Sequence, residues 1–243
     1  MTENDGRGRV EAAIDDLCAR GSGLATFDAD GVLWRGDVGN AFLLWQVENH
    51  RLSREAEREA REAWDLYLRD QYGELELAVL CAAVQRGLPE EQVAADAAAF
   101  IQREFAGQIV PEVREWVRRL RAAGVEVWVV SGSHRWLVQA GARLAGIPPD
   151  RLLAVENEVR DGVLTAEVKT PVTYAEGKAD AIRQHLGRMP DLAAGNTYPD
   201  RFMLELARLP VAVEPDEALQ ELARQRGWPV VRFAGKAVAS DKL

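Results

Sequence analysis

The chain has 243 residues, of which 47% are hydrophobic and 28% charged, so it can bury a full core without a metal ion or disulfides. Thirty Lys and Arg against 39 Asp and Glu give a formal net charge of -9, which argues against a nucleic acid or an anionic membrane as the main partner. The two cysteines, Cys18 and Cys81, exclude a disulfide framework, and each lies in an apolar helical pattern. Residues 1–9 are polar, so we expect no secretory signal and a cytoplasmic protein.

The first half of the chain contains two short apolar runs, at residues 24–27 and 125–130, that are typical of buried parallel strands. A helix is predicted over residues 111–123, because apolar side chains recur there at i, i+3, i+4 and i+7. Pro111 suits its first turn and Gly124 its end.

The second half alternates between the two kinds of element. Helices are predicted at residues 178–186, 201–209 and 216–226, and strands at 192–194, 211–213 and 230–233. This alternation predicts an α/β fold: a Rossmann-like, doubly wound parallel sheet with right-handed crossovers and helices on both faces.

Two segments depart from the alternation. Residues 159–168 carry Asp161-Gly162 between apolar residues, which predicts a hairpin with a primed turn. Residues 37–106 show helical patterns only. An all-helical insertion after the first strand accounts for them, and it would lie over the carboxyl end of the sheet, where open α/β sheets bind ligands.

The first predicted strand ends in two carboxylates, Asp28 and Asp30. Asp28 can attack an electrophile while Asp30 donates a proton to the leaving group and later accepts one from water. Two such close negative charges also suit a hard cation such as Mg²⁺. A solvated acidic turn is the alternative for this motif taken alone.

Three later segments place polar groups at the same edge of the sheet. The strand over 125–130 leads into Ser131-Gly132-Ser133-His134, whose hydroxyl and backbone N–H groups suit a phosphate. Lys178 begins another helix and supplies a positive charge. Asn196 and Asp200 follow a third strand and offer oxygen ligands for a metal.

In the order of these motifs the chain resembles the haloacid dehalogenase superfamily, and within it the phosphoserine-phosphatase-like branch. The resemblance implies that Asp28 is the nucleophile, that Asp30 is the general acid and base, and that Ser131, Gly132 and Lys178 bind phosphate. It also implies Mg²⁺ held by Asp28, Asp30, Asn196 and Asp200. The expected substrate is a small phosphorylated metabolite.

The same resemblance implies a domain division, with a core of residues 1–36 and 107–243 and a helical cap of residues 37–106. One residue departs from the family pattern, because Asn196 stands where an aspartate is usual. We expect weaker metal binding there, and a catalytically impaired module that binds phosphate ligands is the alternative function.

Three residues are candidates for substrate selection. By the resemblance, Asp37 stands where the family places an acid for the substrate's amino group, although an N-cap is an equal alternative. Trp34 and other tryptophans near the catalytic loops favour either core packing or cation–π binding of a quaternary ammonium, as in a phosphocholine-type phosphatase. His134 either contacts substrate or begins a helix. Phosphoserine or another amino-bearing phosphate ester is favoured.

Overall fold

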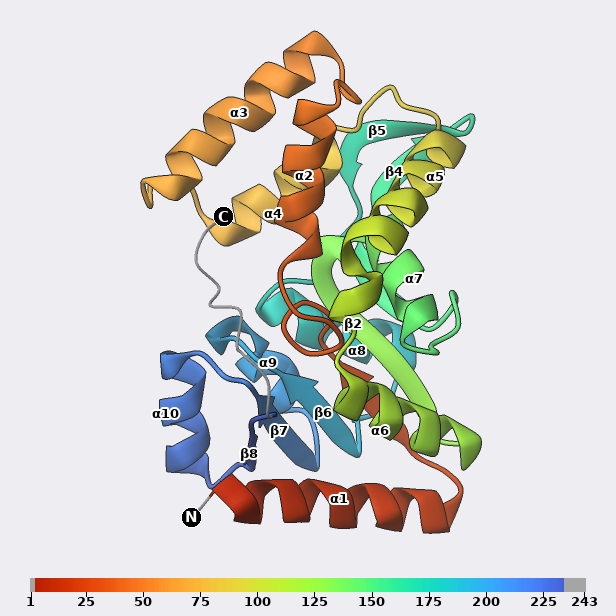
Figure 1. Cartoon of the computed structure of the whole chain (residues 1–243), viewed down its shortest axis with the longest axis vertical. Helices are drawn as coiled ribbons and strands as arrows, with labels where there is room; N and C mark the ends of the chain where they lie inside the picture. Colours follow the sequence, from red (N-terminus) through yellow and green to blue (C-terminus); the bar gives the residue numbers. More distant parts are fainter. Residues whose placement is uncertain (1–2, 234–243) are drawn as a thin grey trace.

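The computed structural model describes residues 3–233, which form a six-stranded parallel sheet, a separate hairpin and surrounding helices (Figure 1). The sheet has the order β3-β2-β1-β6-β7-β8, and all its neighbouring strands run parallel. Its strands are β1 (Leu24–Phe27), β2 (Glu126–His134), β3 (Leu152–Val155), β6 (Leu192–Gly195), β7 (Leu209–Val213) and β8 (Val230–Val231). The hairpin pairs β4 (Asn157–Arg160) with β5 (Val163–Val168).

The α-helices are α1 (Glu3–Arg20), α2 (Val38–Glu48), α3 (Arg54–Leu68), α4 (Glu74–Ala83), α5 (Glu90–Phe100), α6 (Pro111–Ala122), α7 (Arg135–Leu144), α8 (Glu176–Leu186), α9 (Arg201–Leu204) and α10 (Glu217–Arg226). Short 3-10 or π turns add Ile101–Phe105, Ala106–Gln108 and Tyr198–Asp200. Within the described part of the chain, no helix combines the length and the apolar character needed to cross a bilayer.

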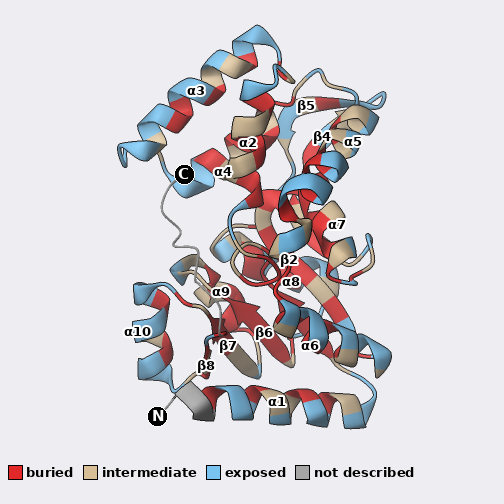
Figure 2. Cartoon of the chain, in the orientation of Figure 1, coloured by how far each residue is buried: buried red, intermediate tan, exposed pale blue. Residues whose placement is uncertain are grey.

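The sheet is buried because helices cover both of its faces (Figure 2). On one face, Ile14 of α1 and Leu120 of α6 belong to the apolar cluster that contains Phe27 of β1. On the other face, Ile182 of α8 and Leu219 of α10 pack in a second cluster. The predicted doubly wound parallel sheet is therefore confirmed.

The helical segment of residues 37–106, called the cap below, has a small apolar core of its own. Trp64, Leu80 and other side chains, mostly from α2, α3 and α4, form it together with Leu52 from the segment between α2 and α3. The hairpin joins this unit: Gly87 donates its backbone N–H to Leu164 (2.8 Å), and Leu164 donates to Leu88 (3.0 Å). All named elements between β1 and α6 are helical, so the inserted segment has the expected character.

Several element boundaries differ from the prediction. The helix predicted over residues 201–209 ends at Leu204, because the backbone N–H groups of Arg208 and Leu209 donate to Pro190 and Asp191 beside β6 and draw the chain into the sheet. The last strand covers only residues 230–231 instead of 230–233. The strand predicted over 125–130 continues to His134, with an irregularity in its pairing to β3.

Two elements lay outside the predictions. β3 is a four-residue strand, and periodicity identifies so short an element poorly. α1 was anticipated only as an apolar pattern around Cys18. Both cysteines are unpaired, with Cys81 buried in the cap and Cys18 partly buried.

Candidate active site

Three neighbouring strands bring the predicted site residues together. β1 lies between β2 and β6, so the loops that follow these strands meet at one edge of the sheet. The chain just after β1 is fixed by Asp28, whose backbone N–H donates to Ala194 of β6 (2.8 Å). The prediction that polar groups from separate crossovers share this edge agrees with the structure.

A buried lysine lies between two buried carboxylates. The Lys178 ammonium donates to Oδ1 of Asp28 (2.7 Å) and to Oδ1 of Asp200 (2.5 Å). Burial and the negative charge of Asp200 raise the pKa of Asp28, while Lys178 opposes the rise. Burial lowers the pKa of Lys178, but the two carboxylates outweigh it and the net pKa is raised. Lys178 is therefore a permanent positive charge at this point.

Asp200 is held away from solvent by its own loop. Its Oδ2 accepts the backbone N–H groups of Asn196 (2.9 Å) and Thr197 (3.1 Å), while Oδ1 is bonded to Lys178. Both oxygens therefore have partners within the protein. Asp200 thus supports Lys178 and the loop, and its predicted role as a metal ligand stays a prediction.

The Asp30 carboxylate is oriented by three donors. Its Oδ1 accepts Trp34 Nε1 and the Val38 backbone N–H (2.8 Å each), and its Oδ2 accepts the Ser133 hydroxyl (2.6 Å). Burial raises the pKa of Asp30, and these hydrogen bonds partly offset the rise. A carboxyl group with a raised pKa and a fixed orientation is suited to holding and releasing a proton.

Trp34 supports Asp30 and does not form a substrate-facing wall. Its ring is fully buried, and it packs so close to Gly141 that a Cβ added there would lie 2.6 Å from the ring. Other tryptophans near the site also pack against neighbours: Trp45 stacks on Phe42, and Trp136 lies against His134. This arrangement favours the packing alternative over a cation–π cage.

The Ser131–Ser133 segment at the end of β2, called the phosphate loop below because it is predicted to bind phosphate, is partly closed on itself. The Ser131 hydroxyl accepts the Ser133 backbone N–H (3.1 Å), and the Ser131 carbonyl accepts the Thr173 hydroxyl (2.6 Å). Gly132 lies against the ring of Tyr174, 3.4 Å from where a Cβ would stand. Ser133 and Thr173 were not identified as site residues from the sequence, because their roles depend on contacts with the distant residues Asp30 and Ser131 respectively.

The Asn196 side chain contributes to an oxygen-rich centre. One terminal atom of its amide lies 3.1 Å from Oδ2 of Asp28 and 3.0 Å from the carbonyl oxygen of Asp30. Among residues 3–233, no group of three or more His, Cys, Asp or Glu side chains is placed to hold a metal. A cation here would therefore need a carbonyl and an amide oxygen besides Asp28, and such oxygens are ligands that Mg²⁺ accepts.

Asp37 forms the N-cap of α2. Its carboxylate accepts the backbone N–H and the side-chain amide of Asn40 (2.9 Å each). Desolvation and the charge of nearby Asp30 raise the pKa of Asp37 to about 7, although its side chain is exposed. Asp37 therefore caps α2, and its position near Asp30 also allows it to contact a substrate.

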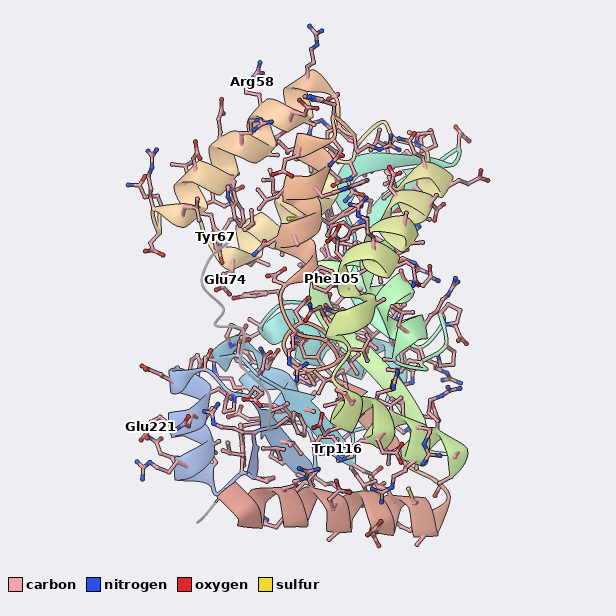
Figure 3. All side chains as sticks on the ribbon, in the orientation of Figure 1. Arg58, Tyr67, Glu74, Phe105, Trp116 and Glu221 are labelled. Atoms are coloured by element: carbon pink, nitrogen blue, oxygen red, sulfur yellow. The ribbon has the colours of Figure 1, made fainter. Side chains whose placement is uncertain are left out.

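A hydrogen bond missed by the sequence analysis joins the cap to the core. The Tyr174 hydroxyl, from the loop before α8, donates to Glu74 at the start of α4. Figure 3 shows Glu74 and Tyr67 at the edge of the cap nearest the core. No local pattern marks this contact, because the two residues are 100 positions apart.

His134 lies outside the reacting centre. It is buried at the start of α7, where its Nε2 meets Oδ1 of Asn157 (2.8 Å). Asn157 donates its amide to Ala82 and Thr165, so its oxygen must accept and the His134 Nε2 carries the proton. Burial lowers the pKa of His134 to about 4, which leaves it neutral and unsuited to donating a proton.

A carboxylate at the end of the first strand, paired with a lysine from a later helix, is the arrangement of enzymes that use an aspartate as nucleophile. The chain belongs to the haloacid dehalogenase-like hydrolases, whose family model matches residues 25–205. Its fold is that of the phosphoserine-phosphatase-like branch.

Two relatives illustrate the sequence similarity. Phosphoserine phosphatase SerB1 of Mycobacterium tuberculosis is 32% identical over 140 residues, covering 55% of this chain and 45% of the relative. The chain thus spans about half the length of this and similar relatives. Histidinol-phosphatase of Neisseria meningitidis is 28% identical over 229 residues, covering 86% of this chain and 98% of the relative.

Solved structures share the fold. A Bordetella pertussis protein of unknown function has a TM-score of 0.76 at 24% identity, with 86% of this chain and 97% of that chain covered. A phosphoserine phosphatase solved as a phospho-aspartyl intermediate analogue has a TM-score of 0.58 at 19% identity, with 89% and 95% covered.

Proposed function

We propose that this protein is a Mg²⁺-dependent phosphomonoesterase that hydrolyses the phosphate ester of a small metabolite in the cytoplasm through an aspartyl phosphate on Asp28. The observation that carries the proposal is the buried Lys178 ammonium 2.7 Å from Asp28, beside an Asp30 carboxylate held by three donors. The curated relatives named as phosphoserine and histidinol phosphatases support the same reaction class.

The first step forms a bond between an Asp28 oxygen and phosphorus while the ester P–O bond breaks. Asp30 gives its proton to the departing alcohol oxygen, which leaves as the neutral alcohol. Lys178 lies beside Asp28 and so offsets negative charge on the phosphoryl oxygens. The Ser131-Gly132 segment lies on the neighbouring strand β2 and binds the phosphoryl group.

The second step returns the enzyme to its starting state. Asp30, now a carboxylate, accepts a proton from water as the water oxygen attacks phosphorus. The bond between phosphorus and Asp28 breaks, and inorganic phosphate is released. Trp34, Val38 and Ser133 hold Asp30 in one orientation for both proton transfers.

The residues of this centre fit Mg²⁺. The ion would be held by the Asp28 carboxylate, the Asp30 carbonyl oxygen and the Asn196 amide oxygen. One terminal atom of the Asn196 amide lies 3.1 Å from Asp28 Oδ2 and 3.0 Å from the Asp30 carbonyl oxygen. When bound, it supplies positive charge to the phosphoryl oxygens and the attacking carboxylate. Asp200 acts on the same centre through Lys178 and the Asn196 backbone.

The substrate is proposed to carry an amino group. Asp37 is exposed and lies close to Asp30, and the negative charge of Glu74 in the cap acts on it by raising its pKa. Phosphoserine and histidinol phosphate both bear an amine and are the substrates that the relatives' names suggest. Residues 37–106 serve as the cap domain, and residues 1–36 and 107–243 as the core.

The decisive experiment compares Asp28→Asn with the wild type. Phosphate release from an aryl phosphate, phosphoserine and histidinol phosphate is measured with Mg²⁺ and with chelator. We expect the variant to lose at least about a thousandfold in rate because it has no nucleophile. Its melting curve should stay cooperative, since an asparagine oxygen still accepts from Lys178.

Asp180→Asn is the matched control, because Asp180 is exposed on α8 and pairs only locally with Arg183 (2.9 Å). It should keep full activity. Near-normal turnover in Asp28→Asn would refute Asp28 as the nucleophile. Wild-type turnover that chelator does not reduce would refute the Mg²⁺ requirement.

A further inference from the structure

A carboxylate of the cap is held beside the phosphate loop. Glu74 begins α4, and its Oε2 accepts the hydroxyl of Tyr174 from the loop before α8. The Tyr174 ring in turn lies against Gly132 of the phosphate loop, 3.4 Å from where a Cβ would stand. The Glu74 carboxylate is therefore one tyrosine ring away from the segment that is proposed to bind the phosphoryl group, although α4 belongs to the cap.

A second carboxylate, that of Asp37 at the start of α2, acts on the same space. Desolvation raises the pKa of Asp37, and the negative charges of Asp30 and Glu74 add to the rise. Desolvation, followed by the charges of Glu74 and Asp37, also raises the pKa of Tyr67, which Figure 3 shows at the same edge of the cap as Glu74. Both carboxylates, called the acidic pair below, are accessible to solvent and thus to a substrate.

The positive and negative charges of the site lie on opposite sides of the phosphate loop. Lys178 is on the core side, where it donates to Asp28 and Asp200. On the cap side, neither carboxylate of the acidic pair forms an ion pair with a Lys, Arg or His among residues 3–233. The single hydrogen bond from Tyr174 fixes Glu74 without neutralising its charge. The field that a substrate meets on the cap side is therefore negative.

We propose that Glu74 is a specificity-determining residue that, together with Asp37, selects phosphate esters whose alcohol carries an amine and no carboxylate. The inference rests on the proposed phosphatase function. With the phosphoryl group between Asp28 and the phosphate loop, the rest of a small ester extends toward the acidic pair. An ammonium group is attracted by both carboxylates, whereas a carboxylate on the same alcohol is repelled by both.

The test measures how strongly three esters inhibit aryl phosphate hydrolysis: ethyl phosphate, phosphoethanolamine and phosphoserine. Phosphoethanolamine adds an amine to ethyl phosphate, and phosphoserine adds a carboxylate to phosphoethanolamine, so each step isolates one charge. We expect the wild type to bind phosphoethanolamine at least about tenfold more tightly than phosphoserine, because like charges repel beside the site. Ethyl phosphate should bind more weakly than phosphoethanolamine.

Glu74→Gln should reduce the preference for phosphoethanolamine over phosphoserine at least about threefold, because one repelling charge is lost. Glu76→Gln is the matched control, since Glu76 is also exposed in the first turn of α4. Its preference should match the wild type. Tyr174→Phe removes the hydrogen bond and keeps the Glu74 charge, so its preference should stay within about twofold of the wild type even if both esters bind more weakly.

Three results overturn the selectivity. They are a wild type that does not prefer phosphoethanolamine over phosphoserine, a preference that Glu74→Gln leaves unchanged, and an equal loss of preference in Tyr174→Phe and Glu74→Gln. The last result would assign the effect to the hydrogen bond instead of the charge. Aryl phosphate turnover that persists in Asp28→Asn contradicts the proposed function instead, so the two failures are distinguishable.

Discussion

At the level of single residues, burial acts differently on each ionisable group near the site. Burial raises the pKa of Asp30, although its carboxylate accepts three hydrogen bonds that lower it. For Lys178 the same burial is overcome by two carboxylates, so the ammonium stays charged. This difference fits the proposed roles, proton transfer by Asp30 and charge neutralisation by Lys178.

His134 gives a pH dependence that can be measured. Its pKa is lowered from 6.5 to about 4 by burial, so between these values the unfolded chain binds a proton that the folded protein does not. Its contribution to folding stability is complete above pH 6.5 and falls as the pH drops toward 4. Between pH 7.5 and 5.0 the loss is about 2 kcal/mol.

Urea unfolding of the wild type and His134→Gln at both pH values isolates this effect. The difference in unfolding free energy between the two proteins should shift by about 2 kcal/mol against the wild type at pH 5.0. Other titrating groups cancel in the comparison. A difference that does not change with pH would contradict a neutral, buried His134.

At the level of elements, two hydrogen-bonded contacts of the cap differ in their exposure to solvent. On the hairpin side, Asn157 donates to Ala82 of the cap (2.9 Å) and accepts from His134 of β2 (2.8 Å), all within the interior. Near the phosphate loop, the Tyr174–Glu74 hydrogen bond joins two solvent-accessible side chains. The second contact is the weaker one, because water competes for both partners.

Tyr174→Phe is expected to loosen the cap near the phosphate loop. Loss of one accessible hydrogen bond should change unfolding free energy by no more than about 1 kcal/mol, while the KM for an amino-bearing phosphate ester rises several-fold. Steady-state kinetics and urea unfolding provide the two measurements. Tyr72→Phe, elsewhere in the cap, is the control, and equal KM changes in both variants would argue against a role for the Tyr174 hydroxyl.

At the level of the whole molecule, the cap carries its own apolar core. Leu80 and Trp64 pack in that core, whereas Leu219 belongs to the cluster under the parallel sheet. The chain passes from core to cap and back through the segments after β1 and before α6 (Figure 1). The separation concerns α3 and α4, because Phe42 of α2 and Phe100 of α5 belong to the cluster that contains Phe27 of β1. The α3–α4 part of the cap can therefore open locally while the sheet remains folded.

Leu80→Ala tests this separation by hydrogen exchange. Removing a buried leucine side chain costs about 2–5 kcal/mol, and the cost should appear as faster exchange in α3 and α4. Amides of β1 and β6 should keep their protection. Leu219→Ala is the matched substitution in the other cluster and should reverse the pattern; equal acceleration throughout in both variants would show one cooperative unit.

Local features were predictable because they depend on residues close in the sequence. Strand 24–27 matches β1, and the Asp161-Gly162 turn has the positive φ values, 52° and 75°, that a primed hairpin turn requires. The candidate site loops could be located as well, since three polar motifs followed predicted strands and Lys178 began a predicted helix. The contacts of the site residues were harder to predict. The burial of Trp34 and the support that Asp200 gives Lys178 arise from contacts between distant segments.

The sequence by itself determined the parallel α/β fold, the inserted helical segment and the edge of the sheet where Asp28, Asp30, Lys178 and Asn196 gather. Periodicity and the rule that parallel strands end at one edge suffice for these. Only the tertiary structure decided that His134 is a buried link, that Tyr174 meets Glu74, and that Asn196 faces two acceptors. These roles depend on side chains brought together from distant positions, which no local pattern records.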